Sequence, residues 1–203
     1  VFLYFMMHLW LLIAPTYQYG NKLMTENDNN VLLDNMLRTM QFEGGHKGKV
    51  YLDSEGYPTI GVGHLLERKK YEVPEGEDKT WVPEKFRDIT WTEEQGKETF
   101  LEDYLRMQED VANRYGKEEF GALSSDKQGV LTDLAFNLGS KPKLDFGNYD
   151  AGLKGYVKFM AGIANNNTTI MLQEYKRYYT DSRGTLQPLN NRNNKFRDTF
   201  LYA

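Results

Sequence analysis

Residues 42–66 read FEGGHKGKVYLDSEGYPTIGVGHLL, and this stretch decides the fold. Apolar residues recur at helical spacing through 31–40, and a pair of glycines follows shortly after, where a helix would end. β-Branched and aromatic residues then fill positions 49–63, interrupted by a Glu-Gly pair and a proline. The pattern predicts a helix over about residues 30–42 and a small antiparallel hairpin directly after it.

Helical patterns dominate the chain downstream of a charged, irregular excursion at residues 67–90. Thr92 and Gln95 form a capping box, which predicts a helix through Asn113. Ser124 or Ser125 caps the next helix, which is apolar enough to be buried at the centre of a lobe. Gly139 would end that helix, and three more helical patterns lie near residues 150–163, 167–178 and 191–201.

The order of these elements predicts an α+β protein. We expect one folded domain over residues 24–203, preceded by a separate segment at 1–23. The domain would consist of a small N-terminal lobe with a β-hairpin, a long connecting helix and an all-helical C-terminal lobe. The expected boundaries of these parts are residues 24–91, 92–113 and 114–203.

Residues 1–14 are apolar except for His8, and Pro15 follows them. The run is shorter than the roughly 20 residues that span a bilayer. It has the length of a signal-peptide core but lacks a basic start and a clear cleavage site. Three interpretations of residues 1–23 stay open: a membrane anchor or export signal, an arm that packs on the domain or a virion protein, and a translated leader.

Composition and charge restrict the classes of function. The chain has no cysteine, which excludes disulfides and thiolate chemistry. Residues 24–140 carry 14 basic and 24 acidic side chains, a net charge of −10, whereas residues 141–203 carry 10 basic and 5 acidic ones, a net charge of +5. The basic C-terminal part either faces an anionic partner or is an ordinary variation of a solvated surface. We expect no nucleic-acid partner, no metal site and no cofactor, because neither basic–aromatic runs nor ligand spacing occurs.

Two carboxylates and a hydroxyl in the deciding stretch could carry out glycoside hydrolysis. Glu43 lies at the end of a helix, where the negative end of the helix dipole disfavours ionisation. Asp53 lies ten residues on, among polar neighbours, and Thr59 lies on the return strand. This reaction needs one protonated carboxyl group and a second group that handles water. Taken alone, the three residues are also compatible with a chance surface arrangement.

The sequence of residues 42–66 resembles that of the bacteriophage T4-type lysozymes, glycoside hydrolase family 24. The shared pattern is E-G-…-Y-x-D-x-x-G-x-x-T-I-G-x-G-H, and further likeness follows in order at 92–103, at 131–139 (LTDLAFNLG) and at 191–200. The resemblance implies a hydrolase of bacterial peptidoglycan that acts as a monomeric catalytic domain. Glu43 would be its general acid, and Asp53 and Thr59 would activate water with inversion.

The resemblance also implies four substrate-binding residues. Glu55 and Asn137 match positions that contact sugar, although Glu55 also fits a plain turn residue. Tyr51 suits packing as well as it suits substrate contact. Tyr178 takes the place of a tryptophan in the substrate cleft, which predicts a platform for a saccharide.

Three further residues match structural contacts of the family. His64 and Asp103 would pair and tie the hairpin lobe to the long helix. Arg192 would approach Glu43 from the closing helix and favour its ionised form, opposing the helix-end effect. The segment between Glu43 and Asp53 is one residue longer than in the T4 enzyme, and we expect the extra residue to be absorbed before the strand.

Two other functions remain as alternatives. A non-catalytic virion or wall-binding protein could keep the fold without the activity. A lytic transglycosylase would need the acid but no water-activating aspartate, so Asp53 argues against it. The sequence leaves open whether a phage would use the enzyme for lysis from within or carry it in the virion for the start of infection.

Overall fold

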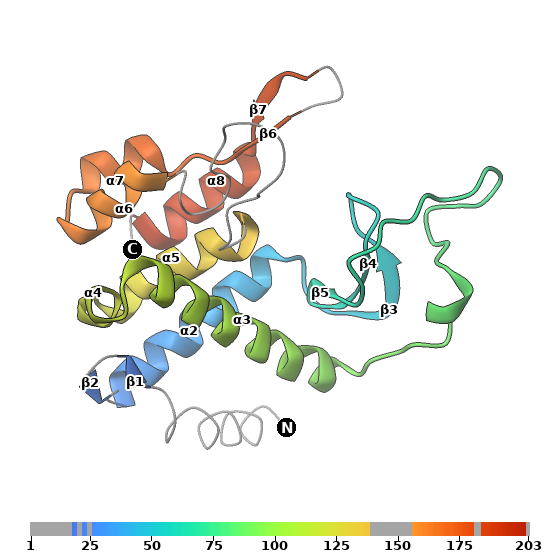
Figure 1. The fold of residues 1–203 in the computed structure, drawn as a ribbon, viewed down its shortest axis with the longest axis horizontal. Helices are drawn as coiled ribbons and strands as arrows, with labels where there is room; N and C mark the ends of the chain where they lie inside the picture. The colour runs from blue at the N-terminus through green and yellow to red at the C-terminus, as the bar shows by residue number, and fades with distance from the viewer. Residues whose placement is uncertain (1–17, 20–21, 24–25, 139–155, 181–183, 202–203) are drawn as a thin grey trace. The chain divides into compact units, whose positions relative to one another are not determined.

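The computed structural model describes residues 18–19, 22–23, 26–138, 156–180 and 184–201 (Figure 1). The chain forms two compact units, of which one contains residues 36–106 and the other contains the remaining described residues. The division falls within two helices, α2 (Glu26–Phe42) and α3 (Glu93–Tyr115). Each unit is described by itself below.

The unit at residues 36–106 is built on a three-stranded antiparallel sheet. Its strands, in spatial order, are β3 (Lys47–Leu52), β4 (Pro58–Gly61) and β5 (His64–Leu65). The predicted hairpin is therefore confirmed, with one more short strand than expected. In Figure 1 the sheet follows α2 along the chain. All four residues of β4 are buried, which suits the central strand of a sheet.

An irregularity in β3 absorbs extra residues. Lys47 lies opposite Gly61 and Tyr51 lies opposite Thr59, so four steps along β3 face two steps along β4. A bulge of this kind bends a strand and re-aims its side chains. The irregularity lies within β3, and the expected position of the extra residue, before the strand, stays a prediction.

The small core of this unit lies between the sheet and the excursion. Its buried members are Val50, Ile60, Val82 and Phe86. Phe86 comes from the 3-10 helix η1 (Glu84–Phe86), the only regular element that the structure has in the predicted irregular stretch 67–90. The predicted capping box is also present: the Thr92 N–H donates to Oε1 of Gln95 (2.9 Å), and the Gln95 N–H donates to Oγ1 of Thr92 (3.2 Å).

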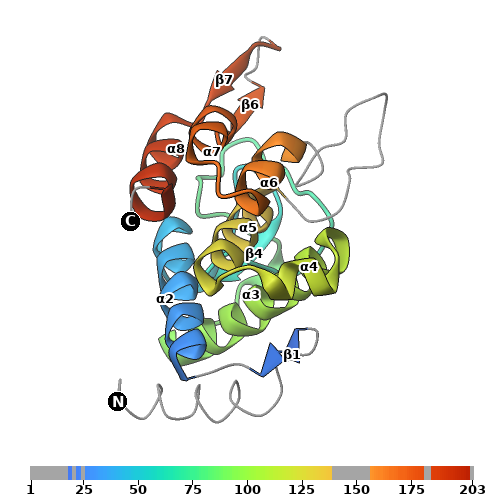
Figure 2. The ribbon, with the colours of Figure 1, turned by 90° about the vertical axis from the view of Figure 1, so that its left-hand side faces the viewer.

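The other unit consists mainly of helices (Figure 2). Its helices after α3 are α4 (Lys117–Ala122), α5 (Ser125–Leu138), α6 (Val157–Ala164), α7 (Thr168–Glu174), α8 (Asn190–Phe196) and the π-helical segment η3 (Arg197–Leu201). Its strands are β1 (Gln18–Tyr19), β2 (Lys22–Leu23), β6 (Tyr178–Thr180) and β7 (Leu186–Pro188), which pair as two hairpins.

Helix α5 lies at the centre of this unit, as predicted. Val130, Leu131, Leu134 and Ala135 are all at most 3% exposed. They share one core with residues from α3, α4, α6 and α8. Burial on several sides explains why the sequence of α5 is apolar around much of its circumference.

Some predictions for this unit need correction. The lobe is not all-helical, because the helix predicted at 167–178 ends at Glu174 and a β-hairpin follows it. Aromatic and β-branched residues favour strands, and the sequence here is Tyr178, Tyr179 and Thr180. The helical spacing of apolar residues does not reveal this preference. Helix α4 was not predicted from the sequence. Gly139, residues 150–155 and residues 1–17, 20 and 21 lie outside the described part.

Strand β1 lies beside α4, so a part of the predicted 1–23 segment contacts the helices. None of the helices that the structure describes is long and apolar enough to cross a membrane.

Candidate active site

Glu43 is held at the carboxyl end of α2. Its N–H donates to the Thr39 carbonyl (3.1 Å), which continues the helical pattern for one residue. Gly44 and Gly45 then take φ angles of +86° and +80°, which end the helix. Gly63 approaches the acid from the sheet: a Cβ atom on Gly63, whose φ is +75°, would lie 3.7 Å from Oε2 of Glu43. The side chain is half-buried.

Asp53 is fixed by the turn between β3 and β4. Its Oδ1 atom accepts hydrogen bonds from the N–H groups of Glu55 (2.8 Å) and Tyr57 (2.9 Å). The turn is closed by the Asp53 N–H, which donates to the Tyr57 carbonyl (2.9 Å). No residue that the structure describes donates a hydrogen bond to Oδ2. The carboxylate is therefore oriented through one oxygen, and the other is left for a further donor such as water.

Thr59 lies on β4, directly after the turn that holds Asp53, and its hydroxyl group is oriented by a hydrogen bond. Its Oγ1 donates to the Tyr57 carbonyl (3.1 Å), and the residue is only 4% exposed. Because the hydroxyl proton is used in that bond, the oxygen can act toward a neighbouring water only as an acceptor.

Tyr51 is electrostatically coupled to both carboxylates. Burial raises the pKa of its phenol, and the charges of Asp53 and Glu43 raise it further. The Lys47 ammonium lies over the Tyr51 ring, 3.7 Å from the centroid. The phenol is thus a neutral hydrogen-bond donor near two acidic groups.

The structure also locates the remaining predicted residues of this unit, His64, Asp103 and Glu55. Nδ1 of His64 and Oδ2 of Asp103 lie 2.7 Å apart, so the predicted pair is present and joins the sheet to α3. The His64 ring also packs on Trp91, with centroids 5.3 Å apart. Glu55 projects from the turn and pairs with Lys70 at 2.8 Å.

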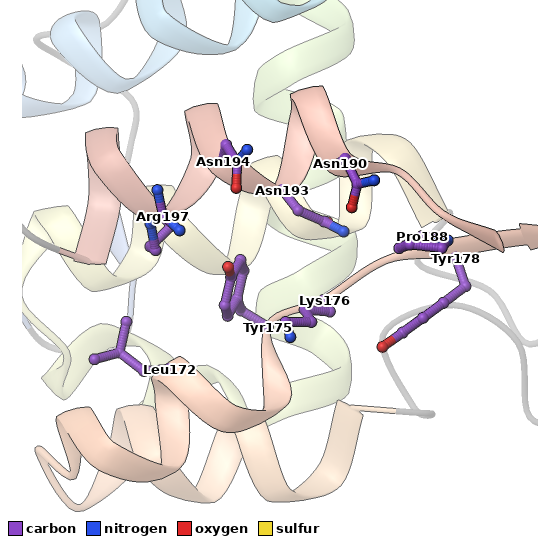
Figure 3. A pocket seen from close by; sticks show the side chains of 9 residues that line it. All are labelled: Leu172, Tyr175, Lys176, Tyr178, Pro188, Asn190, Asn193, Asn194 and Arg197. Carbon is purple, nitrogen blue, oxygen red and sulfur yellow. The ribbon is translucent and has the colours of Figure 1, made fainter.

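In the helical unit, Tyr178 lines an open pocket of about 410 Å³ (Figure 3). Figure 3 shows side chains of two tyrosines, three asparagines and two cations gathered around it. They are Tyr175, Tyr178, Asn190, Asn193, Asn194, Lys176 and Arg197, and Leu172 and Pro188 complete the lining. The Tyr178 side chain is 45% exposed, which leaves its ring accessible for stacking.

A buried cluster holds the start of the strand that carries Tyr178. Its members are Arg177, Asp133, Asn193 and Phe196, and it is called the clamp below. Arg177 is fully buried, and its Nη2 donates to Oδ2 of Asp133 (2.8 Å), which is also fully buried. Its guanidinium lies over the Phe196 ring, 4.4 Å from the centroid. The Asn193 amide accepts from the Arg177 N–H (2.9 Å) and donates to the Arg177 carbonyl (3.0 Å). Burial lowers the pKa of the guanidinium, and the Asp133 charge opposes that effect.

The sequence did not identify this clamp, because arginine and aspartate are ordinarily surface residues. Two other predicted residues belong to the helical unit. Asn137 lies near the end of α5, and its side chain is outside the described part. Arg192 lies half-buried on α8, next to the clamp residue Asn193. Its predicted approach to Glu43 stays a prediction.

Among the described residues, no three histidine, aspartate or glutamate side chains gather as metal ligands would.

The comparisons with known proteins decide the family. The family model described as phage lysozyme matches residues 40–195. This chain belongs to the phage lysozyme family. Residues 40–195 contain the turn, the sheet and the clamp described above, so family membership supports a glycosidase role on peptidoglycan and a phage origin.

One curated relative is the pre-baseplate central spike protein Gp5 of Enterobacteria phage T4. It is 30% identical over 134 residues, which are 63% of this chain but 23% of that protein. This chain therefore spans about a quarter of the length of that relative.

Two solved structures share the lysozyme-like α+β fold. A point mutant of P22 lysozyme has a TM-score of 0.53 at 19% identity, over 83% of this chain and 95% of that one. The endolysin from Escherichia coli O157:H7 phage FAHEc1 has a TM-score of 0.52 at 17% identity, over 88% and 90%. The predicted fold class is confirmed.

Proposed function

We propose that the chain is a muramidase that hydrolyses the β-1,4 bond between N-acetylmuramic acid and N-acetylglucosamine in peptidoglycan. The observation that carries the proposal is the turn of Asp53: one carboxylate oxygen is held by two backbone N–H groups, and the other is left for water. A base held in this way needs little reorganisation when water attacks.

Each of the three residues has a distinct role in the proposed reaction. Glu43 protonates the leaving glycosidic oxygen. Asp53 takes a proton from the attacking water through Oδ2. The Thr59 hydroxyl oxygen accepts a hydrogen bond from the other O–H group of that water, because its own proton is donated to the Tyr57 carbonyl. Water attack on the face opposite the leaving group inverts the anomeric centre.

Each unit by itself offers residues suited to substrate binding. Tyr51 and Glu55 lie beside the proposed acid and base, where the sugar must lie for hydrolysis. The pocket beside Tyr178 offers an accessible ring and convergent amide groups, which match the apolar face and the acetamido groups of an N-acetylated saccharide. Asn137 and Arg192 keep the substrate-binding and Glu43-facing roles that the family pattern implies.

Product analysis tests the proposal and separates the alternatives. Purified peptidoglycan is digested, and the released ends are identified by mass spectrometry. Hydrolysis gives reducing ends, a lytic transglycosylase gives 1,6-anhydro ends, and a non-catalytic wall-binding protein gives neither. Proton NMR of the first product formed then gives the anomeric configuration, and a retained configuration would contradict the role of Asp53.

The similarity to a T4 spike protein favours a virion-borne enzyme over one used only for lysis. Residues 1–23 would then contact another virion protein, whereas a lysis enzyme would use them at a membrane or for export. Mass spectrometry of purified virions decides between these settings: presence at a fixed copy number supports the first, and absence supports the second.

A further inference from the structure

The start of the excursion is bonded to the turn that holds Asp53. The Leu66 N–H donates to the Pro58 carbonyl (2.9 Å), and the Tyr71 N–H donates to the Gly56 carbonyl (2.8 Å). Gly56 has a φ of +88°, and a Cβ atom there would lie 2.7 Å from the Tyr71 carbonyl oxygen. Only glycine allows so close an approach. Backbone hydrogen bonds at residues 66 and 71 thus hold the start of the excursion against the turn.

Tyr71 in turn is anchored in the small core. Its ring packs edge-on against Phe86, with centroids 6.0 Å apart, and its hydroxyl donates to Glu67 (3.3 Å). The residue before it, Lys70, is therefore placed by backbone bonds on one side and by an anchored ring on the other.

The Lys70 side chain reaches back over the same turn. Its Nζ donates to Oε2 of Glu55 (2.8 Å) and lies 5.0 Å from the centroid of the Tyr57 ring. The hydrogen bond to Glu55 raises the pKa of Lys70, and the charges of Glu55, Tyr57 and Asp53 raise it further. The ammonium therefore contacts one proposed sugar-binding residue and is attracted by the proposed base.

We propose that Lys70 is a positioning residue for the hydrolysis: it holds the Glu55 carboxylate in the orientation in which that carboxylate meets the sugar. The inference rests on the proposed function, since it assigns a task within that reaction. Lys70 does not touch the reacting atoms. It acts through Glu55, the carboxylate to which its ammonium donates.

The test uses Lys70→Met, Lys70→Arg and the matched control Lys69→Met. Lys69 carries the same charge one residue earlier, and its ammonium lies 5.0 Å from the Tyr71 ring centroid. The kcat and KM values on soluble peptidoglycan fragments are measured at low salt. The Lys70 side chain is 53% exposed, so the melting temperature of each variant should stay within about 2 °C of the wild-type value.

For Lys70→Met we expect KM to rise about two- to fivefold with kcat nearly unchanged, because the affected residue contacts the sugar and not the reacting atoms. Lys70→Arg should restore KM because it keeps the cation, and Lys69→Met should leave KM unmoved. A KM that is equal in Lys70→Met and Lys69→Met would overturn the inference, as would a Lys70→Arg KM like that of Lys70→Met. A wild-type chain that releases no reducing ends would instead contradict the proposed function.

Discussion

Tyr51 of β3 lies directly opposite Thr59 of β4. Residues that face each other in an antiparallel pair project from the same face of the sheet. The neutral phenol, the oriented hydroxyl and the turn of Asp53 that follows β3 are thereby gathered at one end of the hairpin. This register explains why so short a sheet can carry most of the proposed chemistry.

Replacing Thr59 tests whether its hydroxyl faces the attacking water. Thr59→Glu should stop turnover or give a covalent glycosyl-enzyme, because a carboxylate placed where water stands can attack the anomeric carbon itself. Thr59→Ser, which keeps the hydroxyl group, is the control. Intact-protein mass spectrometry after incubation with peptidoglycan detects the adduct. Normal release of inverted product by Thr59→Glu would contradict the role.

Gly63 should matter to activity beyond its backbone angle. Gly63→Ala places a methyl group 3.7 Å from Oε2 of Glu43, whereas Gly76→Ala meets a similar φ (+89°) with no neighbour within 4 Å. Both variants should lose roughly 1–2 kcal/mol of stability from the positive φ. Only Gly63→Ala should also lower kcat. Thermal melts and initial rates of the two variants give the comparison, and equal kcat values would show that Gly63 serves the backbone alone.

The buried pair of Arg177 and Asp133 predicts an asymmetric stability response. Asp133→Asn leaves the arginine charge without its carboxylate partner and should cost about 3–5 kcal/mol. For a chain of this size that corresponds to a fall of roughly 6–20 °C in melting temperature. The double variant Asp133→Leu with Arg177→Met removes both charges and should melt close to the wild type. A double variant that melts as low as Asp133→Asn would contradict an electrostatic origin.

Much of this fold could be predicted because its signals are local. The Thr92–Gln95 capping box and the apolar surface of α5 depend on residues a few positions apart. The clamp does not: Arg177 meets Asp133 from 44 positions away, and only the folded chain shows that an arginine is fully buried there.

Some residues of the candidate site could likewise be predicted from the sequence, and others could not. The pattern of residues 42–66 placed Glu43, Asp53 and Thr59 in one segment, which the structure holds in one unit. Lys70 was part of an excursion that appeared to be ordinary solvated surface, because its bonds to the Asp53 turn depend on tertiary packing. Gly56 was visible as part of the interruption in the hairpin pattern, but the atoms that it approaches were not.

Truncation tests where the catalytic domain begins. We expect the chain without residues 1–23 to stay folded and active, because the core pattern starts near Val31. A second truncation that removes only residues 1–17 keeps β1, which lies beside α4. Calorimetry in mild detergent compares both with the full chain. A drop of more than about 5 °C only on removal of residues 18–23 would assign those residues to the domain and contradict a start near Met24.

The central claim is that Glu43 delivers the proton. Glu43→Gln keeps the shape of the side chain but cannot act as an acid, so the rate of reducing-end release from purified peptidoglycan should fall by about 10²–10⁴-fold. The melting temperature should stay nearly unchanged, and the exposed control Glu94→Gln should keep the wild-type rate. If Glu43→Gln retained a tenth of the wild-type rate, Glu43 would not be the general acid.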